Sequence, residues 1–327
     1  MTAPLVRAER LTRHFASGGW LRRARPVQAV KDVSLAVARG ETVGLVGESG
    51  SGKSTVGRLL LGLLAPTSGR EVFDGTDVST VPPEALRHLR RRMQLVFQDP
   101  YGSLDPRRRV GAQIADGLRI HALAPEADVD LRVRALLEQV GLPAEHAARY
   151  PHEFSGGQRQ RVAIARALAT GLDFLVADEP VSALDVSVQA QVLALLADLR
   201  LRLGLAMLFI SHDLPVVRHL CDRVVVMYLG RVMEEGPVAR VFAQPLHPYT
   251  QALLSAAPIP DPERRRARIV LQGDVPSPAN VPSGCHFHTR CPMARAVCRQ
   301  TVLPLREVRP GQSAACHFAG PFPIPLA

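Results

Sequence analysis

A glycine-rich loop that ends in Lys and Ser is the stretch of this 327-residue sequence best equipped for chemistry. It reads Gly47-Glu48-Ser49-Gly50-Ser51-Gly52-Lys53-Ser54. Glycines let backbone N–H groups come close to phosphate oxygens, a lysine can reach the β- and γ-phosphates, and a serine hydroxyl can bind Mg²⁺. The pattern therefore predicts a phosphate-binding loop for a nucleotide, and the alternative is an ordinary Gly/Ser turn.

The segments on either side of this loop favour phosphate binding. Residues 41–46 are apolar and β-branched, as in a buried strand, and residues 55–64 have the length and the leucines of a helix. In the order strand, loop, helix, the N-terminus of the helix adds positive potential where the phosphates bind. Thr55, in the first turn of the expected helix, joins the candidate nucleotide-binding residues.

Two adjacent carboxylates follow a second apolar strand. Residues 172–177 are mostly apolar and lead into Asp178 and Glu179. In a protein with a phosphate-binding loop, an Asp at a strand end can hold Mg²⁺, which is the role we expect for Asp178. Glu179 then polarises the water that attacks the γ-phosphate, as a general base. The alternative is a pair of solvated acids that ends a strand.

A second Ser/Gly loop lies ahead of these carboxylates. It reads Ser155-Gly156-Gly157-Gln158 and leads into a helical stretch over residues 159–167, so it is a second helix N-terminus able to bind an anion. This loop alone is a weak signal. It gains weight from the two motifs already described and from two further polar segments, residues 182–185 and 210–213.

These motifs, taken in order, resemble the ATP-binding subunit of an ABC transporter over residues 1 to about 257. Residues 47–54 match the Walker A loop, Gln98 matches the Q-loop, and residues 155–158 match the ABC signature. Asp178 matches the Walker B aspartate, and Glu179 matches the catalytic glutamate. Residues 182–185, which end in Asp185, match the D-loop, and His212 matches the switch histidine. Phe154 stands where the family more often has Leu, a change that we expect to be tolerated.

The resemblance implies ATP and Mg²⁺ as cofactors. It implies Mg²⁺ contacts from Ser54, Gln98 and Asp178, and catalysis by Glu179 with His212 and Lys53 at the γ-phosphate. It further implies a head-to-tail dimer, in which ATP on one Walker A loop is capped by the signature and D-loops of the other chain. Phe15 falls where the family's adenine-stacking aromatic lies, and a core phenylalanine is the alternative.

Several phrases narrow the resemblance to the oligopeptide/dipeptide and nickel importers. They are residues 97–101, 179–187 and 246–254, together with the tail. The tail carries Cys285, Cys291, Cys298 and Cys316, with 5, 6 and 17 residues between them. Four thiolates in a reducing compartment favour a metal site, and this spacing lacks the close Cys pairs of most zinc modules.

The resemblance implies a [4Fe-4S] cluster on these four cysteines, since such clusters accept thiolates at irregular spacing. Zn²⁺ and unmetallated buried thiols are the alternatives. The fifth cysteine, Cys221, lies in an apolar helical stretch and is expected in the core.

The expected fold is an α/β cassette with a mostly parallel sheet. Strands over residues 5–15 and 30–37 give it an antiparallel layer, and a helical insert spans about residues 99–170. After about residue 258 proline becomes frequent and the cysteines appear, which predicts a cassette over residues 1–257 and a small Cys-containing domain over residues 258–327.

Composition limits the cellular location. The sequence has 46% hydrophobic residues, a formal net charge of +10, no apolar run long enough to cross a bilayer and no signal-peptide core at its start. We therefore expect a cytosolic protein that does not itself span a membrane, and the resemblance implies a peripheral position at the cytoplasmic face of the inner membrane. The arginine runs indicate solvated faces, attraction to an anionic membrane or to nucleic acid, or a bias toward arginine codons.

The leading hypothesis is an ATPase that powers uptake of peptides. The resemblance implies a second cassette, which we expect to be a paralogue, two membrane permeases and an extracytoplasmic binding protein, without nucleic acid. The alternatives are a soluble ABC ATPase that acts on nucleic acid or ribosomes, and an importer of nickel or another small solute.

Overall fold

The computed structural model describes residues 3–16, 26–257 and 269–320 of the chain. These residues form two compact units, and each unit is assembled from segments that are far apart in the sequence. The first unit comprises Met1–Val6, Ala36–Glu41 and Val72–Leu208, and the second comprises Arg7–Leu35, Thr42–Glu71 and Phe209–Ala327. The predicted phosphate-binding loop belongs to the second unit, and the Asp178-Glu179 pair belongs to the first.

The second unit is built on strands from both ends of the chain. Its strands are β1 (Val6–Phe15), β2 (Val27–Val37), β3 (Thr42–Val46), β4 (Ser68–Phe73), β9 (Arg223–Tyr228), β10 (Arg231–Pro237), β11 (Arg306–Arg309) and β12 (Gln312–Ala314). Its helices are α1 (Lys53–Leu60), α8 (Leu214–Leu220), α9 (Val238–Ala243), α10 (Pro248–Ala256) and α11 (Ala296–Gln300). The strands follow the orders β2-β1-β4 and β11-β12-β10-β9-β3.

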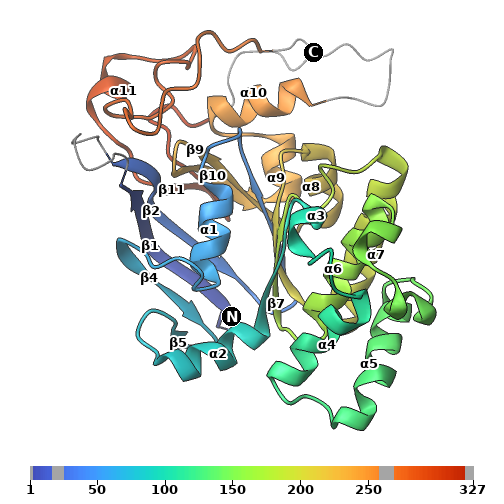
Figure 1. Cartoon of the computed structure of the whole chain (residues 1–327). Coiled ribbons are helices and arrows are strands. Elements are labelled where there is room, and N and C mark those ends of the chain that lie inside the picture. Colours follow the sequence, from blue (N-terminus) through green and yellow to red (C-terminus); the bar gives the residue numbers. More distant parts are fainter. Residues whose placement is uncertain (1–2, 17–25, 258–268, 321–327) are drawn as a thin grey trace, which may run out of the picture. The chain divides into compact units, whose positions relative to one another are not determined.

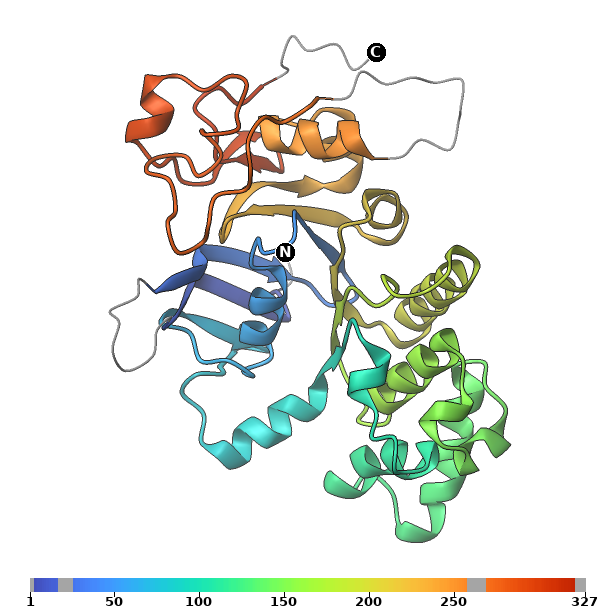
Figure 2. The ribbon, with the colours of Figure 1, turned by 45° about the horizontal axis from the view of Figure 1, so that its top comes forward.

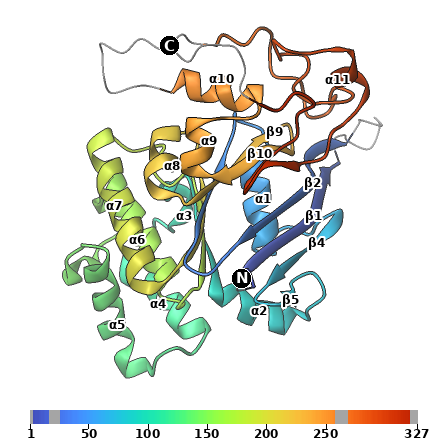
Figure 3. The same ribbon diagram turned by 180° about the vertical axis from the view of Figure 1, so that it is seen from behind.

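The second of these sheet segments is mixed, where the sequence predicted a mostly parallel sheet. β3 and β9 run parallel, whereas β10 is antiparallel to both β9 and β12. All five residues of β3 are buried, because α8 packs against it. Helix α9 packs on β9 and β10 on the same side (Figure 3). β9 ends at Tyr228 and β10 begins at Arg231, a short turn that only an antiparallel pair allows. β12 reaches β10 from much farther along the chain.

The first unit holds most of the helices. Its strands are β5 (Thr76–Asp77), β6 (Met93–Val96), β7 (Phe174–Asp178) and most of β8 (Ala206–Ile210), and its helices are α2 (Pro83–Arg92), α3 (Pro100–Ser103), α4 (Val110–Ile120), α5 (Glu126–Gln139), α6 (Gly156–Leu168) and α7 (Val186–Leu203). β6 and β7 pair in parallel. Helices α4 to α7 pack together (Figure 2), and α4, α5 and α6 lie within the helical insert expected over about residues 99–170.

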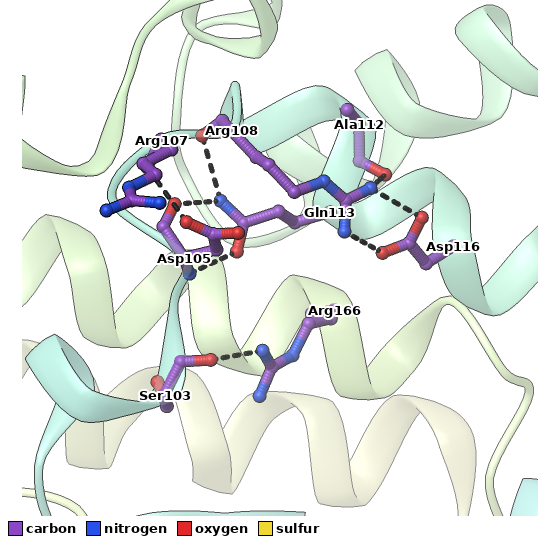
Figure 4. Close-up of polar contacts among 8 residues, drawn as sticks. All are labelled: Ser103, Asp105, Arg107, Arg108, Ala112, Gln113, Asp116 and Arg166. Carbon is purple, nitrogen blue, oxygen red and sulfur yellow. Dashed lines mark hydrogen bonds and ion pairs between the residues drawn. The ribbon is translucent and has the colours of Figure 1, made fainter.

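A buried glutamine fixes the loop that leads into α4. The Gln113 side chain donates to the carbonyl oxygens of Asp105 and Arg108, at 3.0 and 2.9 Å, and accepts the Asp105 N–H at 2.9 Å (Figure 4). The Arg166 guanidinium, from α6, donates to the Ser103 carbonyl oxygen. The segment between the predicted Q-loop and the helices is therefore held by side chains that satisfy backbone groups.

The sequence located most elements but missed or misplaced some. Helix α2 has no buried residue, so it lacks the apolar stripe on which a helix prediction depends, and its arginines were interpreted only as a solvated run. Helix α1 ends at Leu60, short of the expected residue 64, and Gly62 follows it at φ 59°. Cys221 is buried, as expected, but it caps the end of α8 and does not lie inside a helix.

In the part of the chain that the structure describes, no helix combines the length and the apolar character needed to cross a bilayer.

One carboxylate ties several segments of the first unit together. Asp74 lies in the turn between β4 and β5 at φ 49° and accepts from Arg92 Nη2 at 2.7 Å and from Arg39 Nη2 at 2.5 Å. Arg92 also donates to Asp173, at the entrance to β7, at 2.5 Å. The hydrogen bond from Arg92 is the main cause that holds the pKa of Asp74 below its ordinary value.

We expect Asp74→Asn to lower Tm at neutral pH by about 1–3 °C, the effect of one partly exposed ion pair. Asn keeps the positive φ without strain, so the substitution isolates the charge. Because the pKa of Asp74 is lowered in the folded state, its stabilisation exists above its unfolded pKa and is lost as pH falls through the folded value. The Tm difference between wild type and variant, measured by calorimetry, should therefore shrink as the pH falls below the ordinary aspartate pKa of about 3.9. A difference that stays constant down to pH 3 would contradict the ion-pair explanation, and Asp198→Asn, in the exposed pair with Arg202, is the matched control.

Candidate functional site

The predicted phosphate-binding loop joins β3 to α1 in the second unit (Figure 1). One side of the loop presses against neighbouring backbone. A Cβ on Gly47 would lie 2.2 Å from the Met227 carbonyl oxygen, and a Cβ on Gly52 would lie 2.2 Å from that of Ala29. The other side is open, because Ser49 and Gly50 are exposed and a Cβ on Gly50 would meet no atom within 4 Å. Ligand phosphate can approach only from this open side.

The Lys53 side chain turns back into the loop. Lys53 is 5% exposed, and its Nζ donates to the carbonyl oxygens of Gly47 at 2.8 Å and Glu48 at 3.0 Å and lies 3.4 Å from Ser51 Oγ. A buried ammonium requires such acceptors. Gly52, in the left-handed region at φ 101°, begins α1, whose first turn carries no acidic residue. The backbone N–H groups of the first turn and the positive end of α1 thus face the loop with the lysine, an arrangement suited to an anion.

Tyr249 and Arg290 hold Glu48, the first variable position of this loop, although neither was among the predicted site residues. The Glu48 N–H donates to Tyr249 Oη at 2.9 Å, and the Glu48 carboxylate accepts from Arg290 Nη1 at 2.7 Å. Tyr249 belongs to a phrase noticed only as a family signal, and Arg290 lies between two of the tail cysteines. No local pattern pointed to either contact, because both join segments about 200 or more residues apart in sequence.

Phe15 and His212 also belong to the second unit. Phe15 is half-buried at the end of β1, with the Arg13 guanidinium 4.8 Å from its ring centroid. His212 is exposed just after β8, where the neighbouring Ser211 N–H donates to the Leu45 oxygen of β3 at 3.2 Å. β3 runs directly into the phosphate-binding loop, so His212 follows a strand end beside that loop. Their contacts with adenine and with the γ-phosphate remain predictions.

The carboxylate pair of the first unit has an unusual backbone. Asp178 is buried at the end of β7, and Glu179 follows at φ 47°, a left-handed conformation uncommon for residues other than glycine. The Ser182 hydroxyl donates to the Glu179 carbonyl oxygen at 3.1 Å and holds this turn. Gln98 Nε2 donates to Glu179 Oε2 at 3.1 Å. The structure thus brings together the predicted Q-loop glutamine and catalytic glutamate, a contact that spacing could not reveal.

The predicted signature loop is a helix cap in the first unit. Ser155 caps α6: its Oγ accepts the Gln158 N–H at 3.4 Å, and the Gln158 side chain accepts the Ser155 N–H at 3.0 Å. A Cβ on Gly157 would lie 2.1 Å from Val188 Cγ1, so the glycine permits close packing of α6 on the start of α7. Asp185, the last D-loop residue, begins α7 and is exposed.

The four tail cysteines line one small cavity in the second unit. Its walls are Cys285, Cys291, Cys298 and Cys316 with His247, Pro248, Phe287, His288, Met293, His317 and Phe318. Burial raises the pKa of Cys285, that of Cys291 to about 12 and that of Cys316 to about 11, and the neighbouring thiols raise them further. His286 does not line this cavity, and its Nδ1 lies 3.0 Å from the Leu229 carbonyl oxygen instead.

Backbone amides are directed at three of the thiols. The N–H groups of Phe287, Met293 and Phe318 each interact with the cysteine two residues earlier and act to lower its pKa. Amides directed at sulfur stabilise thiolates and are a common feature of thiolate-bound metal groups. Among the residues within 3–16, 26–257 and 269–320, however, no three His, Cys, Asp or Glu side chains are arranged to hold one metal ion.

Comparisons with known proteins agree with the motifs. The family model described as ABC transporter matches residues 30–182, and the model described as oligopeptide/dipeptide transporter, C-terminal region, matches residues 233–298. A Brucella ovis protein named for peptide import and ATP binding is 56% identical over 313 residues, which cover 96% of this chain and 97% of that protein. The oligopeptide transport ATP-binding protein AppF of Bacillus subtilis is 49% identical over 305 residues, 92% of this chain and 93% of AppF.

The fold is similar to that of solved ATP-binding cassettes. A dimeric, post-hydrolysis structure of the cassette MJ0796 bound to ADP and Pi has a TM-score of 0.64 and 29% sequence identity, and the match covers 71% of this chain and 98% of the cassette. The cbiO1 structure from Clostridium perfringens gives a TM-score of 0.64 at 30% identity. With these matches, the loop, the carboxylate pair and the signature cap identify the chain as a member of the ABC transporter ATP-binding proteins, in the oligopeptide/dipeptide transporter group.

Proposed function

We propose that this chain is the ATP-hydrolysing subunit that powers peptide import through an ABC transporter. The observation that carries the ATPase is the loop of residues 47–54, closed around the Lys53 ammonium and open on one side to an anion. The match of residues 233–298 to the oligopeptide/dipeptide C-terminal region supports peptides as the cargo. The names of relatives at 49–56% identity favour peptide import over a soluble ATPase that acts on nucleic acid.

In this proposal the chain's own groups bind ATP and direct water. Backbone N–H groups of the loop and Lys53 bind the β- and γ-phosphates, and Ser54, Gln98 and Asp178 hold Mg²⁺, which neutralises developing charge on the phosphates. Glu179 takes a proton from the attacking water, so that ATP and water give ADP and phosphate. The Gln98 hydrogen bond to Glu179 supports a link between Mg²⁺ binding and the base. His212 contacts the γ-phosphate.

The proposed assembly contains two cassettes, two permeases and an extracytoplasmic binding protein at the cytoplasmic face of the membrane. Residues 155–158 and Asp185 of one chain then complete the ATP site of the other cassette. The capped α6 supports this role, because its exposed N-terminus presents a second anion-binding end. Permeases must supply the membrane helices of such a transporter.

We further propose that residues 258–327 form a domain that holds a [4Fe-4S] cluster on Cys285, Cys291, Cys298 and Cys316. The four thiols share one cavity, and backbone amides face three of them, which suits thiolate ligands. A cluster binds each thiolate to a different iron, so its ligands lie farther apart than those of one Zn²⁺ ion. Zn²⁺ on the same cysteines, and buried thiols without a metal, stay the alternatives.

Replacing the proposed base gives the first functional test. Glu179→Gln keeps the side-chain size and removes the proton acceptor, so ATP turnover by the assembled transporter should fall at least about 100-fold. ATP binding should persist, which trapping of radiolabelled ATP would show. Glu145→Gln, an exposed glutamate of the same unit, is the control. Wild-type turnover in Glu179→Gln would remove Glu179 from the base role.

Elemental analysis tests the cluster. The full chain, purified without oxygen, should carry about four iron and four sulfide per chain, with visible absorption that dithionite bleaches. Cys291→Ser should lose most of the iron and sulfide, whereas Cys221→Ser, at the capped end of α8, should keep both. Zinc without sulfide, or neither metal, would contradict the proposal.

A further inference from the structure

Three groups of Glu48, its N–H, its carbonyl oxygen and its carboxylate, each form a hydrogen bond. Its N–H donates to Tyr249 Oη at 2.9 Å, its carbonyl oxygen accepts from Lys53 Nζ at 3.0 Å, and its carboxylate accepts from Arg290 Nη1 at 2.7 Å. One contact is made within the loop, and the other two come from α10 and from the tail. The peptide that follows Gly47 is therefore held from outside the loop.

The ion pair between Arg290 and Glu48 is largely shielded from water. The Arg290 side chain is 10% exposed and that of Glu48 is 26% exposed. Arg290 Nη1 also lies 3.5 Å from Tyr228 Oη, so the guanidinium is placed by a second polar group as well. A shielded pair of this kind is much stronger than an exposed pair, and removal of one partner leaves the other charge uncompensated.

An aromatic cluster supports both outside contacts. The ring centroids of Tyr228 and Tyr249 are 4.8 Å apart, and the Phe287 ring lies 5.3 and 5.2 Å from them. Arg290 Cζ lies 6.0 Å from the Tyr228 ring centroid. Rigid rings with two χ angles each leave the tyrosine hydroxyl and the guanidinium few alternative positions. Tyr249 is fully buried, so its hydroxyl cannot exchange Glu48 for water without opening the cluster.

We propose that Arg290 is a positioning residue of the ATP site, which acts through Glu48 to hold the backbone of the phosphate-binding loop in its binding shape. The inference rests on the proposed assignment of residues 47–54 to ATP binding. Arg290 also neutralises a carboxylate that belongs to a loop meant for polyphosphate. Without it, the Glu48 carboxylate would repel the phosphates, and Glu48 would lose one of the three contacts that hold it.

The same segment borders the cysteine cavity. Arg290 lies between Cys285 and Cys291, and Phe287 contacts both the aromatic cluster and the cavity. The position of Arg290 therefore depends on how the tail folds around its cysteines. This gives the tail a direct mechanical route to the nucleotide loop within one compact unit.

A double-mutant cycle tests the proposal on the full chain. ATP affinity would be measured by calorimetric titration for wild type, Arg290→Ala, Glu48→Gln and the double variant, with Tm recorded without nucleotide. Arg290→Ala should weaken ATP binding about tenfold, and Arg290→Lys should restore part of it. In the Glu48→Gln background, where no carboxylate needs a partner, Arg290→Ala should change affinity by less than about twofold. Arg299→Ala, an exposed arginine of α11, is the matched control.

Each result has a distinct meaning. Wild-type affinity in Arg290→Ala would overturn the proposal, and so would an equal loss in both backgrounds, because the arginine would then act directly or through the fold. If Arg290→Ala lowers Tm so far that binding cannot be measured, Arg290→Lys replaces it in the cycle, alone and combined with Glu48→Gln. A loss of ATP affinity in Arg290→Lys that disappears in the Glu48→Gln background supports the proposal. No loss of affinity, or the same loss in both backgrounds, overturns it. The Lys53→Ala variant tests the underlying assumption that residues 47–54 bind ATP. If Lys53→Ala still binds ATP normally, the assignment of the loop itself fails, whatever Arg290 does.

Discussion

The enclosed ammonium of Lys53 is the interaction on which the nucleotide loop depends. A charged amine that is 5% exposed must find acceptors, and the structure supplies the carbonyl oxygens of Gly47 and Glu48. The loop has positive φ angles at Gly47, Gly50 and Gly52, which glycine adopts without a steric penalty. The Gly47–Glu48 peptide directs its carbonyl oxygen to Lys53 and its N–H to Tyr249 Oη, so both of its polar groups are fixed.

The first unit shows a related use of local strain. Glu179 adopts a left-handed conformation directly after a fully buried strand, and the Ser182 hydroxyl and the Gln98 amide hold its carbonyl and carboxylate. Strain of this kind costs roughly 1–3 kcal/mol and persists only where surrounding contacts enforce it. The strand supplies that support, because its apolar residues cannot shift without exposing core surface. The carboxylate is thereby aimed by packing, and its chemistry follows from its position.

The tail is a structural part of the unit that contains the nucleotide loop. Strand β12 pairs with β10 through Glu234 and Ala314, and β10 pairs in turn with β9, beside the strand that leads into the loop. The buried Glu234 carboxylate accepts from the N–H groups of Leu246 and His247 and from Gln312, so it joins α10, β10 and the tail. Through these contacts the tail packs in the same unit as the predicted phosphate-binding loop, although the two segments are far apart in the sequence.

The sequence alone determined the chemistry and most of the elements. Glycine spacing, the Lys-Ser ending and the carboxylates at a strand end depend on local backbone requirements, so they can be identified without tertiary contacts. The apolar patterns over residues 5–15 and 41–46 likewise located β1 and β3 within about one residue, because burial leaves a recognisable pattern of apolar residues. Helix α2 was not predicted, because it buries no side chain and so has no apolar stripe in its sequence. Only the tertiary structure decided the antiparallel pairing of β10 with β9 and β12, the hydrogen bond between Gln98 and Glu179, and the hydrogen bonds of Tyr249 and Arg290 to Glu48. Each of these joins residues that are distant in the chain, and no local pattern encodes which distant groups will meet when the core packs.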